Sequence, residues 1–287
     1  MVLEDVIGIA ALLIDGISRG FLYAILGLGI TLVFGMGGIL NLSIGVFMVV
    51  AILIVAELTG MVPLALAMAL AIVLTAALGL GIERTLLKLV YRSEGEERLL
   101  LGIFVTLGLA LAMEGAIALN WSGPYSVHLE PPSWEIAGTF IRGRSLVVIG
   151  LALIVLFGMY LFFSRTKVGL ATRTIMQDET GARLCGINID RMRAGIWTLS
   201  IAIAAFGGLL WGISSSADVG NTFALTTIAI VVAIVGGVTS IVGVVVAGVV
   251  LGVISTFLTA YGSTYLASIS LFAIAIIVLL VKPEGFQ

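Results

Sequence analysis

Long apolar runs constrain the fold of this chain more than any other feature. A helix of about 20 mostly apolar residues crosses the hydrocarbon core of a bilayer. Cutting the chain at loops, glycine pairs and prolines leaves nine such runs, at residues 14–36, 39–58, 61–82, 99–119, 146–163, 194–215, 222–238, 241–260 and 266–281. With 61% hydrophobic and 10% charged residues, the sequence predicts an all-α polytopic membrane protein, and one transmembrane domain over residues 1–287.

Glycine-interrupted pieces near Gly37 and Gly236 leave room for broken or re-entrant helices, so we expect eight to ten membrane helices. The apolar residues before Ile14 either extend the first helix or lie at the interface. The amino terminus lacks the basic region and cleavage site of a signal peptide, so we expect the first apolar run to remain in the mature protein.

Basic residues predict the orientation, because loops that stay in the cytoplasm carry the excess of Lys and Arg. Residues 83–98, residues 164–193 and Lys282 together hold eleven of the fourteen Lys and Arg residues. We therefore place both loops and the carboxyl terminus in the cytoplasm, and the amino terminus outside if nine helices cross. Residues 120–145 then form an external loop, and the outer face keeps Arg142 and Arg144, with Arg19 near the start of the first helix.

The loop at residues 164–193 is a charged island between apolar runs. Asp178 is a suitable N-cap, Glu179 adds negative charge to a first turn, and Gly186 ends a short helix. An apolar side of this helix is expected to hold Met176, Leu184 and Ile187. Such a helix either lies in a groove of a partner protein or rests on the membrane surface, and local features do not separate these alternatives.

Polar atoms at membrane depth are few, and Asn41, Ser43 and Gly45 form the main group. An amide buried without a partner costs a few kcal/mol, so Asn41 either bonds a neighbouring helix or lines a wet pathway. The stretch 37–45 resembles 236–243, where Gly236 and Gly237 again separate two apolar runs. This similarity suggests a weak parallel internal repeat, and we include both glycines among the pathway candidates.

Close helix packing is indicated by two small-residue motifs, one at Gly16 and Gly20 and the other at Gly248 and Gly252. The simpler interpretation is tight packing, and the alternative is sliding between helices during transport.

Catalytic chemistry is not predicted. The sequence contains no phosphate-binding loop and no central cluster of carboxylates. Asp15 and Arg19, four residues apart, are expected to pair, and Glu114 is expected to reach the headgroups. His128 is expected on the surface rather than as a metal ligand or pH sensor, and Cys185 as a small buried thiol. We predict no catalytic residue and no metal site.

Five stretches of the sequence, in this order, resemble the permease subunits of branched-chain amino acid ABC importers, a family that also includes urea and short-amide permeases. These stretches are residues 20–58, 82–92, 168–212, 233–254 and 279–285. The family usually carries a histidine where this chain has Ile44, and an alanine where it has Ser43. These differences bear on the substrate range.

The resemblance implies that the chain is a permease subunit that translocates branched-chain or similar hydrophobic amino acids across the cell membrane, and not an enzyme. ATP and Mg²⁺ would bind two partner ATPase subunits rather than this chain. A second homologous permease subunit and an external substrate-binding protein complete the expected assembly in the lipid bilayer, with no nucleic acid. The residues implied in ATPase coupling are Asp178, Glu179, Ala182, Leu184, Gly186 and Ile187. A urea or short-amide permease and a secondary transporter remain as alternatives.

Overall fold

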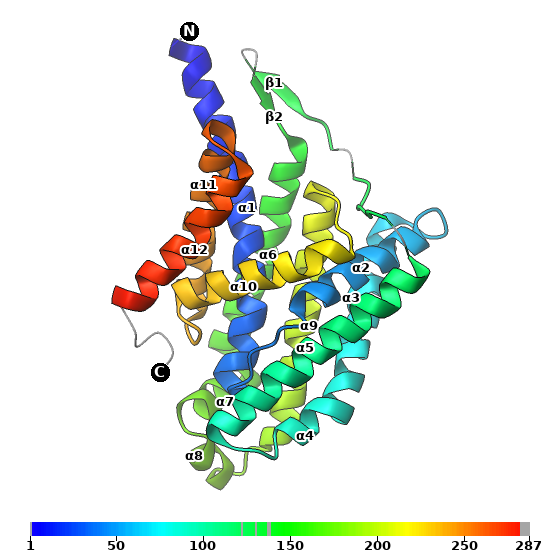
Figure 1. Cartoon of the computed structure of the whole chain (residues 1–287), viewed down its shortest axis with the longest axis vertical. Coiled ribbons are helices and arrows are strands. Elements are labelled where there is room, and N and C mark those ends of the chain that lie inside the picture. The colour runs from blue at the N-terminus through cyan, green and yellow to red at the C-terminus, as the bar shows by residue number, and fades with distance from the viewer. Residues whose placement is uncertain (1, 122, 130, 137–138, 282–287) are drawn as a thin grey trace.

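The computed structural model describes residues 2–121, 123–129, 131–136 and 139–281. Its membrane helices are α1 (Val2–Gly37), α2 (Ile44–Leu58), α3 (Leu64–Ile82), α5 (Gly95–Asn120), α6 (Gly143–Arg165), α9 (Ile189–Ser214), α10 (Thr222–Gly236), α11 (Ile241–Tyr261) and α12 (Thr264–Val281). Over the described residues, eight helical segments are long and apolar enough to cross a membrane, and α2 is a shorter apolar helix. The structure confirms the predicted all-α polytopic membrane fold, and every predicted run corresponds to one of these helices (Figure 1).

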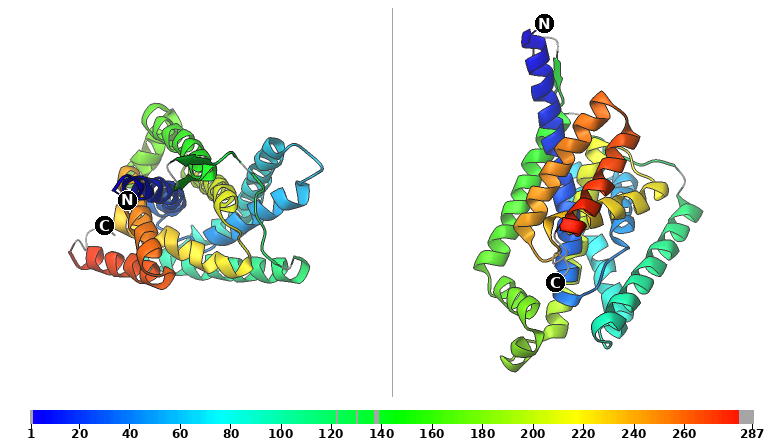
Figure 2. Two further views of the ribbon diagram at one scale, coloured as in Figure 1. Left: turned by 90° about the horizontal axis from the view of Figure 1, so that it is seen from above. Right: turned by 60° about the vertical axis from the view of Figure 1, so that its left-hand side comes forward.

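The core lies around α1 and α9. In the most apolar stretch of α1, 83% of the residues are buried, and 72% in that of α9, against 22% or less for α3, α5, α6 and α12. Seen from above in Figure 2, α1 lies between α6 on one side and α11 on the other. The mostly exposed helices therefore present their apolar surfaces outward, as lipid contact requires.

The residues before Ile14 are helical and extend α1 toward the amino terminus. Its 36 residues give a length of about 54 Å at 1.5 Å per residue. This is well beyond the roughly 30 Å hydrocarbon thickness, so one end of α1 projects past the other helices, as the amino-terminal end does in Figure 1.

Glycines bring α1 and α11 into backbone contact. A side chain at Gly20 would come within 2.6 Å of the Cα of Val249, and one at Gly248 within 2.5 Å of the backbone nitrogen of Ala24. A side chain at Gly252 would overlap the backbone of Gly20 itself. The two small-residue motifs therefore pack against each other, which confirms tight packing as their structural role. Sliding along this contact is untested.

Helix α2 is interrupted at its start. The predicted run began at residue 39, but residues 38–43 are not helical and α2 begins at Ile44. Gly38 adopts the left-handed conformation, with φ 62°, which ends α1 at little steric cost. The segment then turns back into the protein, where Ile39 and Asn41 are completely buried. Residues 38–43 therefore form a non-helical link between α1 and α2.

The two basic loops lie at one end of the molecule. The π-helix η1 (Glu83–Leu87) and the short α4 (Lys88–Val90) belong to the first loop, and α7 (Lys167–Gln177) and α8 (Glu179–Leu184) to the second. Both loops appear at the bottom of Figure 1, opposite the amino-terminal end of α1. Arg98 forms an ion pair with Glu179 across the two loops. Lys282 lies outside the described residues.

The opposite end carries the loop between α5 and α6, whose described residues form no helix. It contains a short antiparallel hairpin of β1 (Trp134–Ile136) and β2 (Thr139–Ile141). His128 is exposed there, as predicted. The Val127 backbone N–H donates a hydrogen bond to the Gly212 carbonyl, which joins the loop to the end of α9. The short 3₁₀ helix η2 (Val219–Asn221) connects α9 to α10.

Candidate coupling element and pathway segment

The charged island folds into two short helices, where the sequence predicted one. The additional helix, α7, begins after Thr166, whose hydroxyl accepts a hydrogen bond from the Gly169 backbone at 3.0 Å. Its buried face is formed by Gly169, Thr172 and Ile175, spaced three residues apart. An N-cap threonine followed by this spacing is a helix signal that could have been recognised in the sequence.

Helix α8 occupies the predicted place, and Gly186 ends it. Gly186 has φ 81°, and the Ile187 backbone donates to the Ala182 carbonyl at 3.1 Å, which is the bond that closes a helix at a left-handed residue. Asp178 holds the N-cap position, but its side chain makes no capping hydrogen bond. The capping role predicted for the Asp178 carboxylate is therefore wrong.

Glu179 joins α8 to the rest of the protein. Its carboxylate accepts from Arg193 at 2.7 Å, from Arg183 at 3.2 Å and from Arg98 at 3.4 Å. The Arg193 side chain is only 2% exposed, and a guanidinium so buried needs a charged partner. Because Arg193 belongs to α9 and Arg98 to α5, one carboxylate connects α8 to two membrane helices. The sequence did not indicate these ion pairs, because Arg98 lies 81 positions from Glu179.

Arg193 extends this connection to the end of α1. Its guanidinium lies over the Tyr91 ring, 4.7 Å from the ring centre. Burial raises the pKa of the Tyr91 hydroxyl, so the phenol stays neutral beside the cation. The same ring packs on Gly37, where a side chain would come within 2.8 Å of it. Glu179, Arg193, Tyr91 and Gly37 thus form a continuous series of contacts from α8 to the start of the interrupted segment.

The six coupling candidates divide between two sides of α8. Ala182 is completely buried and Ile187 packs on the core, whereas Leu184 is 85% exposed. Two residues correspond to about 200° of rotation around a helix, so Leu184 points away from Ala182. Met176, Leu184 and Ile187 therefore do not share one side, and that prediction is wrong, because Met176 and Ile187 face the core.

The exposed residues in and next to α8 are Asp178, Thr180, Arg183, Leu184, Cys185 and Gly186. Cys185 is exposed rather than buried, which corrects the sequence interpretation. Contact with a partner protein would remove the exposed Leu184 side chain from water. The role of these residues in coupling stays a prediction.

Asn41 shapes the non-helical link, residues 38–43, that precedes α2. Its side-chain oxygen accepts from the Ser43 backbone at 3.0 Å and from the Ser43 hydroxyl at 2.7 Å, so this half of the amide shapes a turn. The side-chain nitrogen is buried and has no hydrogen-bond partner among the described residues. The side-chain oxygen of Asn41 therefore stabilises the turn, and its side-chain nitrogen can still donate a hydrogen bond to another group.

Threonines from two other helices hold this turn in place. The Thr106 hydroxyl of α5 donates to the Leu40 carbonyl and accepts from the Leu42 backbone, each at 3.1 Å. The Thr226 hydroxyl of α10 accepts from the Gly45 backbone at 3.0 Å. Gly45 lacks a side chain for a structural reason, since any Cβ would overlap the Thr222 carbonyl.

Gly236 and Gly237 lie in a different place, at the turn between α10 and α11. Gly237 has φ 89° and ends α10, and Gly236 packs against Gly243 and Val244 at the start of α11. Like Gly38, Gly237 ends a helix in the left-handed conformation, which is the feature that the two similar stretches share. Pathway roles for Asn41, Ser43, Gly45, Gly236 and Gly237 stay predictions.

The expected pair of Asp15 and Arg19 is wrong. Asp15 pairs with Arg142 at 3.5 Å and accepts from the Ser145 hydroxyl at 2.6 Å. A tertiary neighbour thus replaces the partner expected from sequence spacing. Glu114 accepts a hydrogen bond from the Thr222 hydroxyl, so its carboxylate joins α5 to α10, and its contact with headgroups stays a prediction.

Together, these features define a multi-pass helical membrane protein whose larger polar loop carries a short helix held by ion pairs. A sequence model described as the permease component of branched-chain amino acid transport systems matches residues 12–281. The chain therefore belongs to this family, as the motifs in its sequence indicated.

Individual relatives agree with the family. The chain is 29% identical to the high-affinity branched-chain amino acid transport system permease protein LivH of Escherichia coli, over 94% of this chain and 92% of LivH. It is also 29% identical to the corresponding permease protein BraD of Pseudomonas aeruginosa, over 70% of this chain and 69% of BraD. A probable ABC transporter permease of E. coli, YphD, is 32% identical over 46% of this chain and 36% of YphD. No solved structure matches the chain significantly.

Proposed function

We propose that this chain is the permease subunit of an ABC importer and moves branched-chain or similar hydrophobic amino acids into the cell. Two ATPase subunits would bind its cytoplasmic loops, a second homologous permease would complete the pathway, and an external binding protein would deliver the substrate. The names of LivH and BraD support the substrate class, and that of YphD supports the ABC assignment.

The observation that carries the proposal is the geometry of α8. It offers the exposed Leu184 to a partner while Glu179 fastens the same helix to α5 and α9. A partner that moves α8 would therefore move the membrane helices with it, as a rigid body. The contacts through Arg193 and Tyr91 to Gly37 would carry this displacement to the turn that holds Asn41.

The test is uptake by proteoliposomes that contain the permeases and ATPases, with ATP inside and the binding protein outside. We expect accumulation of radiolabelled leucine that requires hydrolysable ATP, the ATPase subunits and the external binding protein. The control is the same assembly with an ATPase variant that binds ATP without hydrolysing it. Leucine accumulation by this chain alone, driven by a proton gradient, would overturn the proposal in favour of a secondary transporter.

Urea or a short amide is the alternative substrate within the same family. The observation that favours it is the unpartnered amide nitrogen of Asn41, a donor suited to the carbonyl oxygen of a small amide. The same proteoliposomes decide between the two, because ATP-dependent uptake of radiolabelled urea or acetamide without uptake of leucine would identify an amide permease.

Orientation is proposed with residues 83–98 and 164–193 in the cytoplasm. Cys185 allows a direct test, since it is the only cysteine of the chain and is exposed in the second loop. A membrane-impermeant maleimide should label it in inverted vesicles and not in right-side-out vesicles. Bound ATPase should reduce this labelling, because Cys185 follows Leu184 on the outward side of α8. Labelling of right-side-out vesicles alone would reverse the assigned topology.

A further inference from the structure

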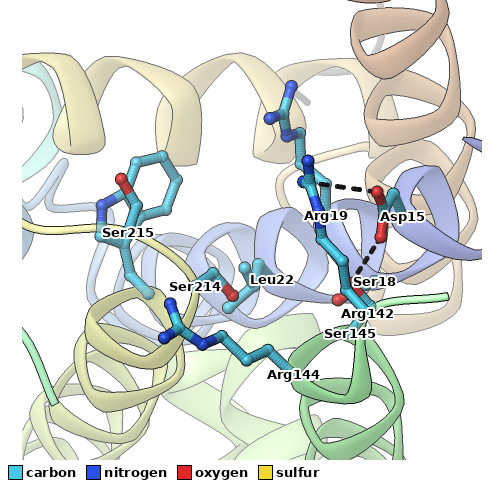
Figure 3. A pocket seen from close by; sticks show the side chains of 10 residues that line it. Asp15, Ser18, Arg19, Leu22, Arg142, Arg144, Ser145, Ser214 and Ser215 are labelled. Carbon is cyan, nitrogen blue, oxygen red and sulfur yellow. Dashed lines mark hydrogen bonds and ion pairs between the residues drawn. The ribbon is translucent and has the colours of Figure 1, made fainter. Parts of the chain in front are cut away.

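Three arginines from the end opposite α8 surround one cavity. Arg19 comes from α1, while Arg142 and Arg144 come from the start of α6 (Figure 3). The cavity has a volume of about 330 Å³, and Ser214, Ser215 and Trp211 of the α9 end complete its wall. These are the three basic residues that the charge pattern placed on the outer face, and folding brings them together.

The charges in this cavity are only partly neutralised. Asp15 pairs with Arg142 and accepts from Ser145. Neither Arg19 nor Arg144 has an ion-pair or hydrogen-bond partner among the described residues. The cavity therefore offers two uncommitted guanidinium groups next to one carboxylate. Guanidinium groups bind carboxylates through two parallel hydrogen bonds.

A second cavity adjoins the first, and the two share Arg19 and Trp211 as lining residues. It has a volume of about 480 Å³ between α1, α10, α11 and α12. Its wall is largely apolar and includes Val231, Leu271 and Phe272, and Arg19 is the one charged residue that lines it. The indole nitrogen of Trp211 is buried without a hydrogen-bond partner in the described part of the chain.

We propose that the two cavities together form a binding site for a free aliphatic α-amino acid on the outer side of this chain. The carboxylate would bind Arg19, with Arg144 adding positive charge, and the ammonium group would lie near Asp15. The aliphatic side chain would enter the larger cavity beyond Arg19 and Trp211. This inference rests on the proposed function and adds to it a substrate site within the permease, separate from the external binding protein.

The adjacent cavities match the chemistry of such a ligand. Its two charged groups meet opposite charges at the polar cavity, and its side chain leaves water for an apolar wall. A ligand without the carboxylate would leave Arg19 unpaired, and one without an aliphatic side chain would leave the larger cavity unused. A zwitterionic lipid headgroup carries the same pair of charges, so the experiment must separate a lipid from a free amino acid.

The test is equilibrium binding of radiolabelled leucine to the purified full chain in a neutral detergent, without partners. We expect saturable binding that leucine and isoleucine compete for, and that leucine amide and glycine compete for at least tenfold less well. Arg19→Gln should weaken leucine binding by at least tenfold. Arg92→Gln, an exposed arginine of the other end, is the matched control and should bind as the unaltered chain does.

A second variant keeps the test decisive if Arg19→Gln unfolds. Ala224 lines the apolar cavity and is exposed on α10, so Ala224→Phe should fill that cavity and weaken leucine binding without removing a charge. Thermal unfolding of each variant measures its folding separately. Loss of leucine affinity in both variants, with folding intact, supports the site.

Three results would overturn the site. The first is the absence of saturable leucine binding at millimolar concentrations. The second is unchanged leucine affinity in a folded Arg19→Gln or Ala224→Phe variant. The third is a co-purifying phospholipid, seen by native mass spectrometry, that leucine does not displace. If ATP-driven leucine uptake succeeds while any of these is found, the proposed function stands and only the site is wrong. If the complete assembly takes up no leucine, the proposed function itself fails.

Discussion

Replacing Glu179 by glutamine should destabilise the protein more than any other single change at a partly exposed carboxylate. The variant keeps the shape of the side chain but leaves the guanidinium of Arg193, only 2% exposed, without a charged partner. Removing one member of a buried ion pair costs about 3–5 kcal/mol. The Glu179 side chain is 32% exposed, so solvent screens part of the interaction and we expect about 2 kcal/mol.

Thermal unfolding of the detergent-solubilised protein, followed by tryptophan fluorescence, measures this effect. For a chain of 150–250 residues, 1 kcal/mol shifts the melting temperature by about 2–4 °C, so Glu179→Gln should lower it by roughly 5 °C. Glu97→Gln is the control, because Glu97 is exposed in the first turn of α5 and has no ion-pair partner among the described residues. It should change stability by less than about 0.5 kcal/mol.

A double-mutant cycle tests whether the Glu179–Arg193 ion pair causes this loss of stability. In an Arg193→Met background the buried charge is gone, and Glu179 keeps only the more exposed Arg98 and Arg183. Glu179→Gln should then cost about 0.5 kcal/mol, which leaves a coupling energy of about 1.5 kcal/mol. Equal costs in the two backgrounds would refute the reasoning, because they would show that the stability comes from contacts other than the Arg193 pair.

Three further predictions follow from single contacts. Gly252→Leu should lower the free energy of unfolding by about 1–3 kcal/mol, because the new side chain would overlap Gly20. Gly108→Ala, which has open space around it, should leave thermal unfolding unchanged. Equal effects of the two variants would argue against the α1–α11 contact. Leu184→Asp should abolish co-purification of the ATPase without changing the melting temperature, since the side chain is 85% exposed, and retained co-purification would exclude it from docking. Thr226→Val should cost about 1–2 kcal/mol because the Gly45 backbone loses its acceptor, and an unchanged melting temperature would contradict this.

Much of the fold was predictable because it depends on residues close together in the sequence. Hydropathy runs placed the membrane helices to within a few residues in most cases. Gly186 and the local sequence placed α8, because a left-handed glycine ends a helix wherever it occurs. Helix α7 was not predicted, although the N-cap Thr166 and the three-residue spacing of Gly169, Thr172 and Ile175 indicate it.

The candidate sites were less predictable because they depend on contacts between distant segments. Gly45 and Thr226 are 181 positions apart, yet their hydrogen bond positions the turn that contains Asn41. Asp15 lies four residues from Arg19 but pairs with Arg142. Spacing within one helix can suggest a partner, but the packing of neighbouring helices determines which partner lies closest.

The sequence by itself determined the class of protein, the approximate bounds of its membrane helices, and the loops that carry charge. Each of these follows from hydropathy, from the cost of burying charge and from local backbone preference, which act over a few turns of helix. Only the tertiary structure decided that Glu179 faces Arg193 while Leu184 faces solvent, and that three outer arginines surround one cavity. These features depend on the rotation and register of packed helices, which no short stretch of sequence specifies.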